Sequence, residues 1–377
     1  MNRIHSLESL RGLLALWVVV GHTIKHCGIA ENELGIFKAL AHPGLAVDVF
    51  IILSGFVIFL LLDQKHETYV RFLTQRWLRI APMYLAVLAL SAATLDWQTK
   101  AILSLPFQGA ARDNDLALHL ATADHFVRHL IAHASLLHGL LSSSILPQSQ
   151  YAFVGQAWSI SVEWQFYLVA PLIFWLTATR KWHYLASLLV IACLIRSFNY
   201  VGEGFAINQA AFFIIGMASY TAWKRASEIT ISNGLLNLFF VTGAALTYLL
   251  LPNSLSLLLW IAVMSVLISE KRQSLSPVGA MVSRTMNHAI LRWLGAISYS
   301  VYLIHLLVFY TAATLLYAQF PAWNKFQFVA ALLPIVCLAT VGISSITYYL
   351  IEQPGIKIGR RIGRVPRAEI RAESPAL

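Results

Sequence analysis

Apolar residues run along this chain in long stretches separated by short polar breaks, a pattern typical of membrane-spanning helices. We interpret ten stretches as spans, which predicts an all-α, polytopic integral membrane protein. The predicted spans lie near residues 9–28, 44–62, 79–95, 158–177, 184–200, 206–223, 235–251, 256–269, 293–317 and 327–351. We expect one membrane domain over residues 1–354 and a basic, disordered cytoplasmic tail over 355–377.

The longest interval between spans, residues 96–157, contains a further apolar run at 129–141. Counting it as a crossing would invert the distribution of basic loop residues, so we interpret it as an interfacial or re-entrant helix. His125, His129 and His133 recur every four residues and would share one helical face. The favoured interpretation is the polar face of an amphipathic helix. A metal site is the alternative, but no carboxylate or cysteine completes a ligand set, and no metal is expected.

Composition agrees with a membrane protein, because 58% of the residues are hydrophobic and only 12% are charged. The net charge of +10 would suit a nucleic-acid partner in a soluble protein. Here it follows the topology, since 19 loop Lys and Arg residues lie on the side of the N-terminus and 5 on the other side. Both termini are therefore predicted to be cytoplasmic, and no nucleic-acid partner is expected.

Two ionisable residues, Arg11 and His22, interrupt the first predicted span. Such side chains are costly in hydrocarbon and persist where they face a protein interior or a watery cavity, so each is a candidate functional residue. Eleven positions separate them by about 16 Å along a helix, roughly half of a bilayer core. The predicted topology places Arg11 near the cytoplasmic side and His22 near the outer side.

The same topology assigns depths to the other ionisable candidates. Asp48 and Glu163 fall in the outer layer with His22, where a carboxylate could orient the imidazole as a general base. Arg76 and Arg79 share one helical face in the inner layer and could bind a phosphate or a carboxylate. The alternatives are a hydrogen-bonded core histidine, a helix-capping Asp48, a Glu163 paired with an arginine, and ordinary positive-inside anchoring.

The ninth predicted span places Tyr302 and His305 near mid-membrane, one helical turn apart. A hydroxyl and an imidazole at that depth suggest the lining of a channel through the protein. Hydrogen bonding between helices is an equally good interpretation.

Together these segments resemble acyltransferase family 3, the bacterial membrane O-acyltransferases of surface polysaccharides and glycolipids. The resemblance covers residues 3–354, and its motifs occur in family order. They are Arg11 with His22, GLAVDVFIILSGF at 44–56, Arg76 with Arg79, Ile80 and Pro82, WSISVEWQFY at 158–167, SYSVYLIH at 298–305, and IEQP at 351–354. Trp164 stands where the family usually has a second acidic residue, so no paired glutamates are expected there.

The resemblance implies that an acyl group, often acetyl, passes from cytoplasmic acyl-CoA to a carbohydrate or glycolipid hydroxyl at the outer face of a bacterial cytoplasmic membrane. His22 would be the catalytic base, and Arg76 and Arg79 would bind the CoA portion. Arg11 belongs to the His22 motif, and we assign it to the donor path together with Tyr302 and His305.

In the expected mechanism His22 deprotonates the acceptor hydroxyl, with Glu163 or Asp48 holding the imidazole; a covalent acyl-histidine is an alternative. A proton-coupled transporter or flippase of a lipid-linked sugar would use the same polar axis as a translocation path. A non-catalytic assembly subunit is the third interpretation. Membrane lipid is an expected partner in each case, and the oligomeric state stays open.

Overall fold

A computed structural model describes residues 4–362 apart from 66, 108, 198–201, 203, 229, 230, 252 and 253. All regular structure in these residues is helical, which confirms the all-α prediction. The α-helices are α1 (His5–His26), α2 (Pro43–Gln64), α3 (Tyr69–Ala93), α4 (Leu95–Ser104), α5 (Ala110–Asp124), α6 (Phe126–Ala134), α7 (Trp158–Ala178), α8 (Trp182–Ser197), α9 (Ala210–Lys224), α10 (Asn233–Leu250), α11 (Leu255–Lys271), α12 (Pro277–Met286), α13 (Ala289–Gln319), α14 (Lys325–Thr347) and α15 (Gln353–Ile362). Short 3₁₀ helices and one π-helical turn connect them: η1 (Glu31–Glu33), η2 (Gly35–Ala41), η3 (His138–Leu140), η4 (Gly155–Ala157), η5 (Ala206–Gln209) and the π-helix η6 (Tyr348–Glu352).

Each of the ten predicted spans falls on one of these helices, although residues 198–200 of the fifth lie outside the described residues. In the described part of the chain, six helices are long and apolar enough to cross a membrane, or seven if the bent pair α3–α4 is one span. This number is below ten in part because α8, α9 and α11 have 16, 15 and 17 residues. A helix of 16 residues is about 24 Å long, which is shorter than a bilayer core of about 30 Å.

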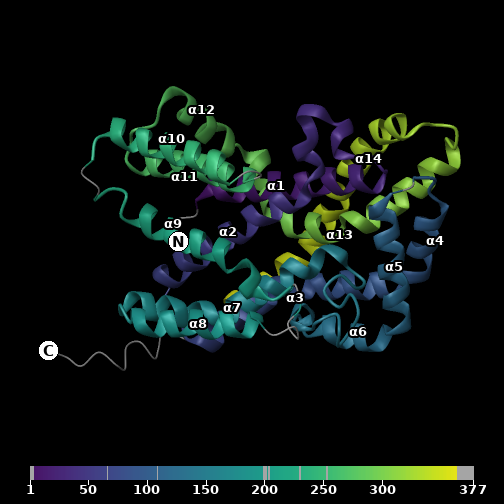
Figure 1. The fold of residues 1–377 in the computed structure, drawn as a ribbon, viewed down its shortest axis with the longest axis horizontal. Helices are drawn as coiled ribbons and strands as arrows, with labels where there is room; N and C mark the ends of the chain where they lie inside the picture. Colours follow the sequence, from purple (N-terminus) through teal and green to yellow (C-terminus); the bar gives the residue numbers. More distant parts are fainter. Residues whose placement is uncertain are drawn as a thin grey trace.

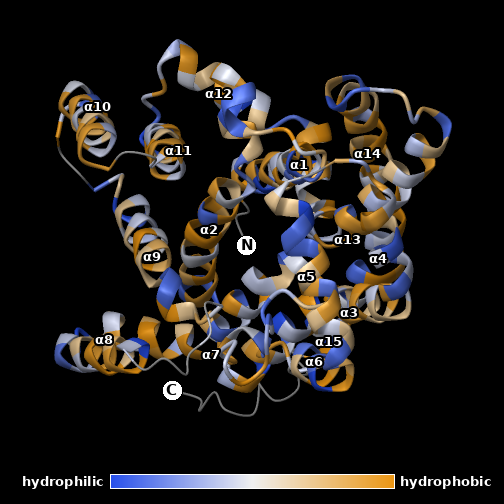
Figure 2. Ribbon diagram, turned by 45° about the vertical axis from the view of Figure 1, so that its right-hand side comes forward, coloured by the Kyte–Doolittle hydropathy of each residue, from blue (hydrophilic) through white to orange (hydrophobic). Residues whose placement is uncertain are grey.

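The centre of the molecule is built on α1, α2 and α13 (Figure 1). Helix α2 is predominantly apolar along its length, as its colouring in Figure 2 shows. Helix α1 makes its largest contact with α13, where Gly12 faces Gly295. A Cβ atom at position 12 would lie 2.7 Å from the backbone nitrogen of Gly295, and one at position 295 would overlap the Glu8 carbonyl oxygen. The two helix backbones therefore touch, as small residues allow in membrane proteins.

Helix α15 packs along the first half of α3. Gly355 and Gly359, one turn apart, allow the close approach: a Cβ at 355 would lie 2.5 Å from the Leu78 carbonyl oxygen, and one at 359 would lie 3.4 Å from Cα of Gln75. Residues 355–362 of the predicted disordered tail are thus helical and packed, because their glycines fit the surface of α3. Residues 363–377 of that tail lie outside the described residues.

Residues 95–134 form the short helices α4, α5 and α6, gathered along one edge of the molecule opposite α10, α11 and α12 (Figure 1). Helix α6 buries its histidine face, with His129 and His133 fully buried, and exposes Val127 and Ile131. We expected the histidines to form a solvated polar face, and the orientation is the reverse. Apolar side chains can point outward here because the surroundings of a membrane protein include lipid.

Candidate active site

His22 and His305 meet because α1 and α13 run side by side in a constant register. Gly12 faces Gly295, and ten residues further along both helices Nδ1 of His22 lies 2.8 Å from Nε2 of His305. The rings are nearly parallel, with centroids 5.0 Å apart. Since both helices rise equally over ten residues, the glycine contact positions the histidine contact.

The partners of His305 determine which ring nitrogens carry protons. Nδ1 of His305 lies 2.8 Å from the Tyr302 carbonyl oxygen, which can only accept, so Nδ1 is the donor. Nε2 of a neutral His305 is then an acceptor, and Nδ1 of His22 donates to it. A neutral His22 with its proton on Nδ1 has an unprotonated Nε2. This is the atom that a general base needs.

A cavity of about 690 Å³ opens on the side of Tyr302 that faces away from the histidine pair. This volume lies in the range of about 300–1,000 Å³ typical of ligand pockets. The lining residues of α2 extend from Val47 to Gln64, which corresponds to about 26 Å along the helix axis. The cavity therefore follows almost the whole length of α2, a distance close to the thickness of a bilayer core.

Arg11, Arg76 and Arg79, which were predicted to share one layer, all line this cavity. The electrostatic partners of Arg11 include Arg79 and Glu163, and those of Arg76 include Tyr167 and Glu163. The buried Nε of Arg76 has no hydrogen-bond partner among the described residues. Three guanidinium groups in a cavity with an unsatisfied donor can bind an anionic ligand.

Glu163 lies among these arginines rather than beside His22. It lines the cavity and accepts hydrogen bonds from the Ser54 hydroxyl, at 3.1 Å, and from the Tyr167 hydroxyl. Asp48 is bonded to Ser256 of α11 instead. The structure thus places His305, and not a carboxylate, against Nδ1 of His22.

Glu352 belongs to the IEQP motif at 351–354, but the sequence alone assigned no role to it. Glu352 is 1% exposed, lines the cavity, and accepts a 2.8 Å hydrogen bond from the Ser300 hydroxyl. Its principal electrostatic partners are Arg79 and Arg11. It ends the π-helical turn η6, a type of irregularity that often occurs at functional sites. A buried carboxylate next to two arginines can hold their side chains in place.

Tyr302 forms part of the cavity wall at the end near Phe50, close to the start of α2. Its hydroxyl bonds Ser159 at 2.8 Å and the Gln156 carbonyl at 2.7 Å, and its ring meets Phe50 edge-on. Tyr302 therefore combines both sequence interpretations, because it lines the cavity and also bonds a neighbouring segment.

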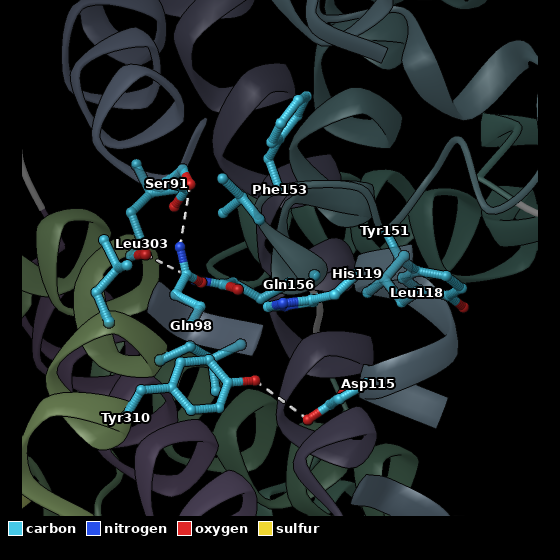
Figure 3. A pocket seen from close by; sticks show the side chains of 14 residues that line it. Ser91, Gln98, Asp115, Leu118, His119, Tyr151, Phe153, Gln156, Leu303 and Tyr310 are labelled. Atoms are coloured by element: carbon cyan, nitrogen blue, oxygen red, sulfur yellow. Dashed lines mark hydrogen bonds between the residues drawn. The ribbon is translucent and has the colours of Figure 1, made fainter. Parts of the chain in front are cut away.

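A second, small pocket lies between α4, α5 and α13, where Gln98, Asp115 and Tyr310 line it (Figure 3). It has a volume of about 30 Å³, room for about two water molecules. Asp115 accepts hydrogen bonds there from the Tyr310 hydroxyl, at 3.1 Å, and from His26, at 2.8 Å. The sequence did not identify His26 as a candidate, although it follows His22 by four residues and shares its helical face. The ring centroids of His22 and His26 are 5.8 Å apart.

The histidines of α6 and η3 form a separate buried group. Nε2 of His133 donates to the Ser149 carbonyl at 2.7 Å, and Nδ1 accepts from the Tyr84 hydroxyl at 2.8 Å. The His138 ring stacks on His133 at 3.9 Å. Burial lowers the pKa of His138 to about 3 and holds the pKa of His133 well below its usual value. Among the described residues no group of three or more His, Cys, Asp or Glu could hold a metal ion.

Comparison with known proteins gave one informative result. The model of a protein family described as an acyltransferase domain matches residues 4–349. Searches of the curated proteins and of the solved structures gave no match. The match includes both histidines of the pair and the three arginines of the cavity.

Proposed function

Because this chain belongs to acyltransferase family 3, a family of membrane acyltransferases, we propose that its donor is an acyl-CoA, most simply acetyl-CoA, and its acceptor a carbohydrate or glycolipid hydroxyl. The donor would enter the cavity from the cytoplasmic side of a bacterial inner membrane. The acceptor would approach His22 from the opposite face.

The observation that carries this proposal is the cavity that leads from three arginines to Tyr302. Tyr302 is one turn from His305, and its carbonyl belongs to the hydrogen-bond chain that ends at His22. A CoA thioester is a long molecule with phosphates at one end and a reactive carbonyl at the other. Phosphates at Arg76 and Arg79 would direct the pantetheine arm along α2 toward the histidine pair.

The reaction uses Nε2 of His22 twice, first as a proton acceptor and then as a proton donor. This nitrogen accepts the proton of the acceptor hydroxyl while the oxygen attacks the thioester carbonyl. The C–S bond then breaks, an ester forms, and the departing thiolate takes the proton from His22. His305 keeps the required nitrogen unprotonated by accepting the hydrogen bond from Nδ1.

We assign the pocket of Figure 3 to the acceptor. On α13 the pocket is lined by Leu303, Leu306, Leu307 and Tyr310, so it runs alongside the position of His305; Tyr310 lies about 12 Å along the helix from Tyr302 at the cavity. Asp115 lines the pocket, and its partner His26 lies next to His22. Polar groups of this kind suit the hydroxyls of a carbohydrate.

Purified protein in lipid nanodiscs tests the donor assignment. Acetyl-CoA should bind saturably, and Arg76→Ala with Arg79→Ala should abolish binding, whereas Arg284→Ala, an exposed residue of α12 outside the cavity, should have no effect. Mass spectrometry of the surface glycans of a strain lacking this gene should reveal a missing acyl group. A transporter or flippase would consume no thioester, and its loss would leave the acylation of the glycan unchanged.

A further inference from the structure

The open end of the cavity carries a second group of cations, in addition to the three arginines. Lys65, at the end of α2, and Lys357 and Arg360, on α15, all line the cavity. Lys357 and Arg360 are exposed and lie three residues apart, so they share one face of the helix. Their exposure identifies this end of the cavity as its mouth.

The mouth is held in position by backbone packing. Gly359 lies against Gln75 of α3, and Lys65 contacts the Gln75 side chain at 3.4 Å. The end of α2, the start of α3 and the face of α15 are thereby joined at one residue. The cations at the mouth are consequently part of the cavity wall and not of a free tail.

The charge of the cavity is suited to a polyanion. Six Lys and Arg residues line it against three glutamates, Glu8, Glu163 and Glu352, which leaves an excess of three positive charges. Glu163 and Glu352 are close to the inner arginines, that is, Arg11, Arg76 and Arg79. Much of the excess positive charge therefore belongs to the mouth. Glu67 offsets one of these charges through an ion pair with Lys65 at 3.2 Å.

We propose that Lys65, Lys357 and Arg360 form a second phosphate subsite that holds the ribose 3′-phosphate of the donor nucleotide, while the inner arginines hold its diphosphate. This rests on the proposed function, because it names the part of acyl-CoA that each group of cations recognises. CoA carries its phosphates in two places, a diphosphate at the base of the pantetheine arm and a phosphomonoester on the ribose. Two groups of cations along one cavity match that arrangement.

The test compares acetyl-CoA with acetyl-3′-dephospho-CoA, which lacks only the phosphomonoester, on the full chain in nanodiscs. Charge-assisted hydrogen bonds to phosphate predict about tenfold tighter binding of acetyl-CoA. Arg360→Gln and Lys357→Gln should reduce this preference toward equal affinity. Arg361→Gln is the matched control: its neighbouring, exposed side chain does not line the cavity, and the preference should persist.

Phosphate at the mouth could also come from an anionic lipid headgroup, so the measurements are made in nanodiscs of neutral and of anionic lipid. A preference for acetyl-CoA that persists in neutral lipid and disappears in Arg360→Gln supports the proposal. Equal binding of the two thioesters by the unaltered protein overturns it, as does an effect of Arg360→Gln only in anionic lipid. If acetyl-CoA binds and depends on Arg76 and Arg79, such a result leaves the proposed function standing; if acetyl-CoA does not bind at all, both fail.

Discussion

At the scale of single residues, the hydrogen-bond chain from the Tyr302 carbonyl through His305 to His22 is the most informative feature. A carbonyl oxygen can only accept, and this determines the direction of both hydrogen bonds. His22 therefore presents Nε2 as an acceptor, and the partner of its Nδ1 is His305 rather than a carboxylate. His305 is a positioning residue in this arrangement.

Replacing His22 should stop the chemistry and leave donor binding intact. Loss of a general base lowers kcat by about 100- to 10,000-fold. Because His22 does not line the cavity, the dissociation constant of acetyl-CoA should be unchanged in His22→Ala. Thioester turnover and equilibrium binding, measured on the same preparation, separate the two effects. Turnover by folded His22→Ala at the original rate would contradict the assignment of the base.

Replacing His305 should give a smaller loss with a distinguishing signature. In His305→Ala the Nδ1–H of His22 loses its acceptor, so the ring can carry its proton on either nitrogen, and kcat should fall by at least about tenfold without a change in donor affinity. His305→Gln keeps an acceptor oxygen near that position and should recover part of the rate. If alanine and glutamine behave alike, the hydrogen bond has no positioning role.

At the scale of helices, the contact between Gly12 and Gly295 sets the geometry of the His22–His305 pair from about 15 Å away. A methyl group at position 295 would overlap the Glu8 carbonyl oxygen, and neither backbone can yield without moving its helix. We expect Gly295→Ala to destabilise the protein by about 1–3 kcal/mol. It should also lower kcat, because separating α1 from α13 separates the histidines.

The control for this prediction is Gly342→Ala in α14, where a Cβ would meet nothing within 4 Å. Alanine there should leave stability unchanged or raise it by up to about 1 kcal/mol, since glycine is the poorer helix former. Thermal unfolding and acetyl-CoA turnover give the comparison. Full activity of Gly295→Ala would show that the close contact does not position His22.

The stacked histidines of α6 and η3 make this region sensitive to acid. His133 and His138 are neutral when folded because burial lowers their pKa, that of His138 to about 3, whereas an unfolded histidine has a pKa of about 6.5. Their contribution to stability is therefore complete above pH 6.5 and is lost as the pH falls below it. Each such group removes about 1.4 kcal/mol per pH unit below that value.

Hydrogen exchange in α6 and η3 between pH 7 and pH 5 measures this loss. His138→Phe keeps a ring against His133 but cannot take up a proton, so its protection should fall less steeply with decreasing pH. His183→Phe, at an exposed position of α8, is a suitable control and should leave the slope unchanged. An identical slope in His138→Phe would rule out this histidine as the source.

At the scale of the whole molecule, the sequence predicted the positions of the helices better than the contacts between them. Runs of apolar residues are local, so hydropathy alone placed helices such as α2 and α13. The pair His22 and His305 is separated by 283 residues, and only the register of two glycines brings it together. Glu163 was predicted to lie near His22 because the two residues were assigned similar depths in the membrane. The partners of Glu163, Ser54 and Tyr167, depend instead on the rotation of α7 about its axis.

The distinction between local sequence patterns and contacts with distant segments also explains why the predictions for α6 and α15 differ from the structure. The histidines of α6 were interpreted as a solvated face because polar residues normally point to water, but here the apolar side chains point outward. The basic composition after Pro354 indicated disorder, whereas two glycines one turn apart dock this segment onto α3. In both cases the decisive contact is made with a distant segment, which composition does not record.

The orientation of the cavity gives the last prediction, because the topology predicted from the basic loops would place its mouth in the cytoplasm. With Cys193→Ser removing the one exposed cysteine among those described, Lys357→Cys should react with a membrane-impermeant maleimide only in inside-out vesicles. Acetyl-CoA should slow this reaction but not that of Arg361→Cys, which lies outside the cavity. Lys38→Cys, predicted on the opposite face, should react only in right-side-out vesicles. Labelling of Lys357→Cys from the outer side would reverse the topology and would place donor entry on the wrong side of the membrane for a cytoplasmic thioester.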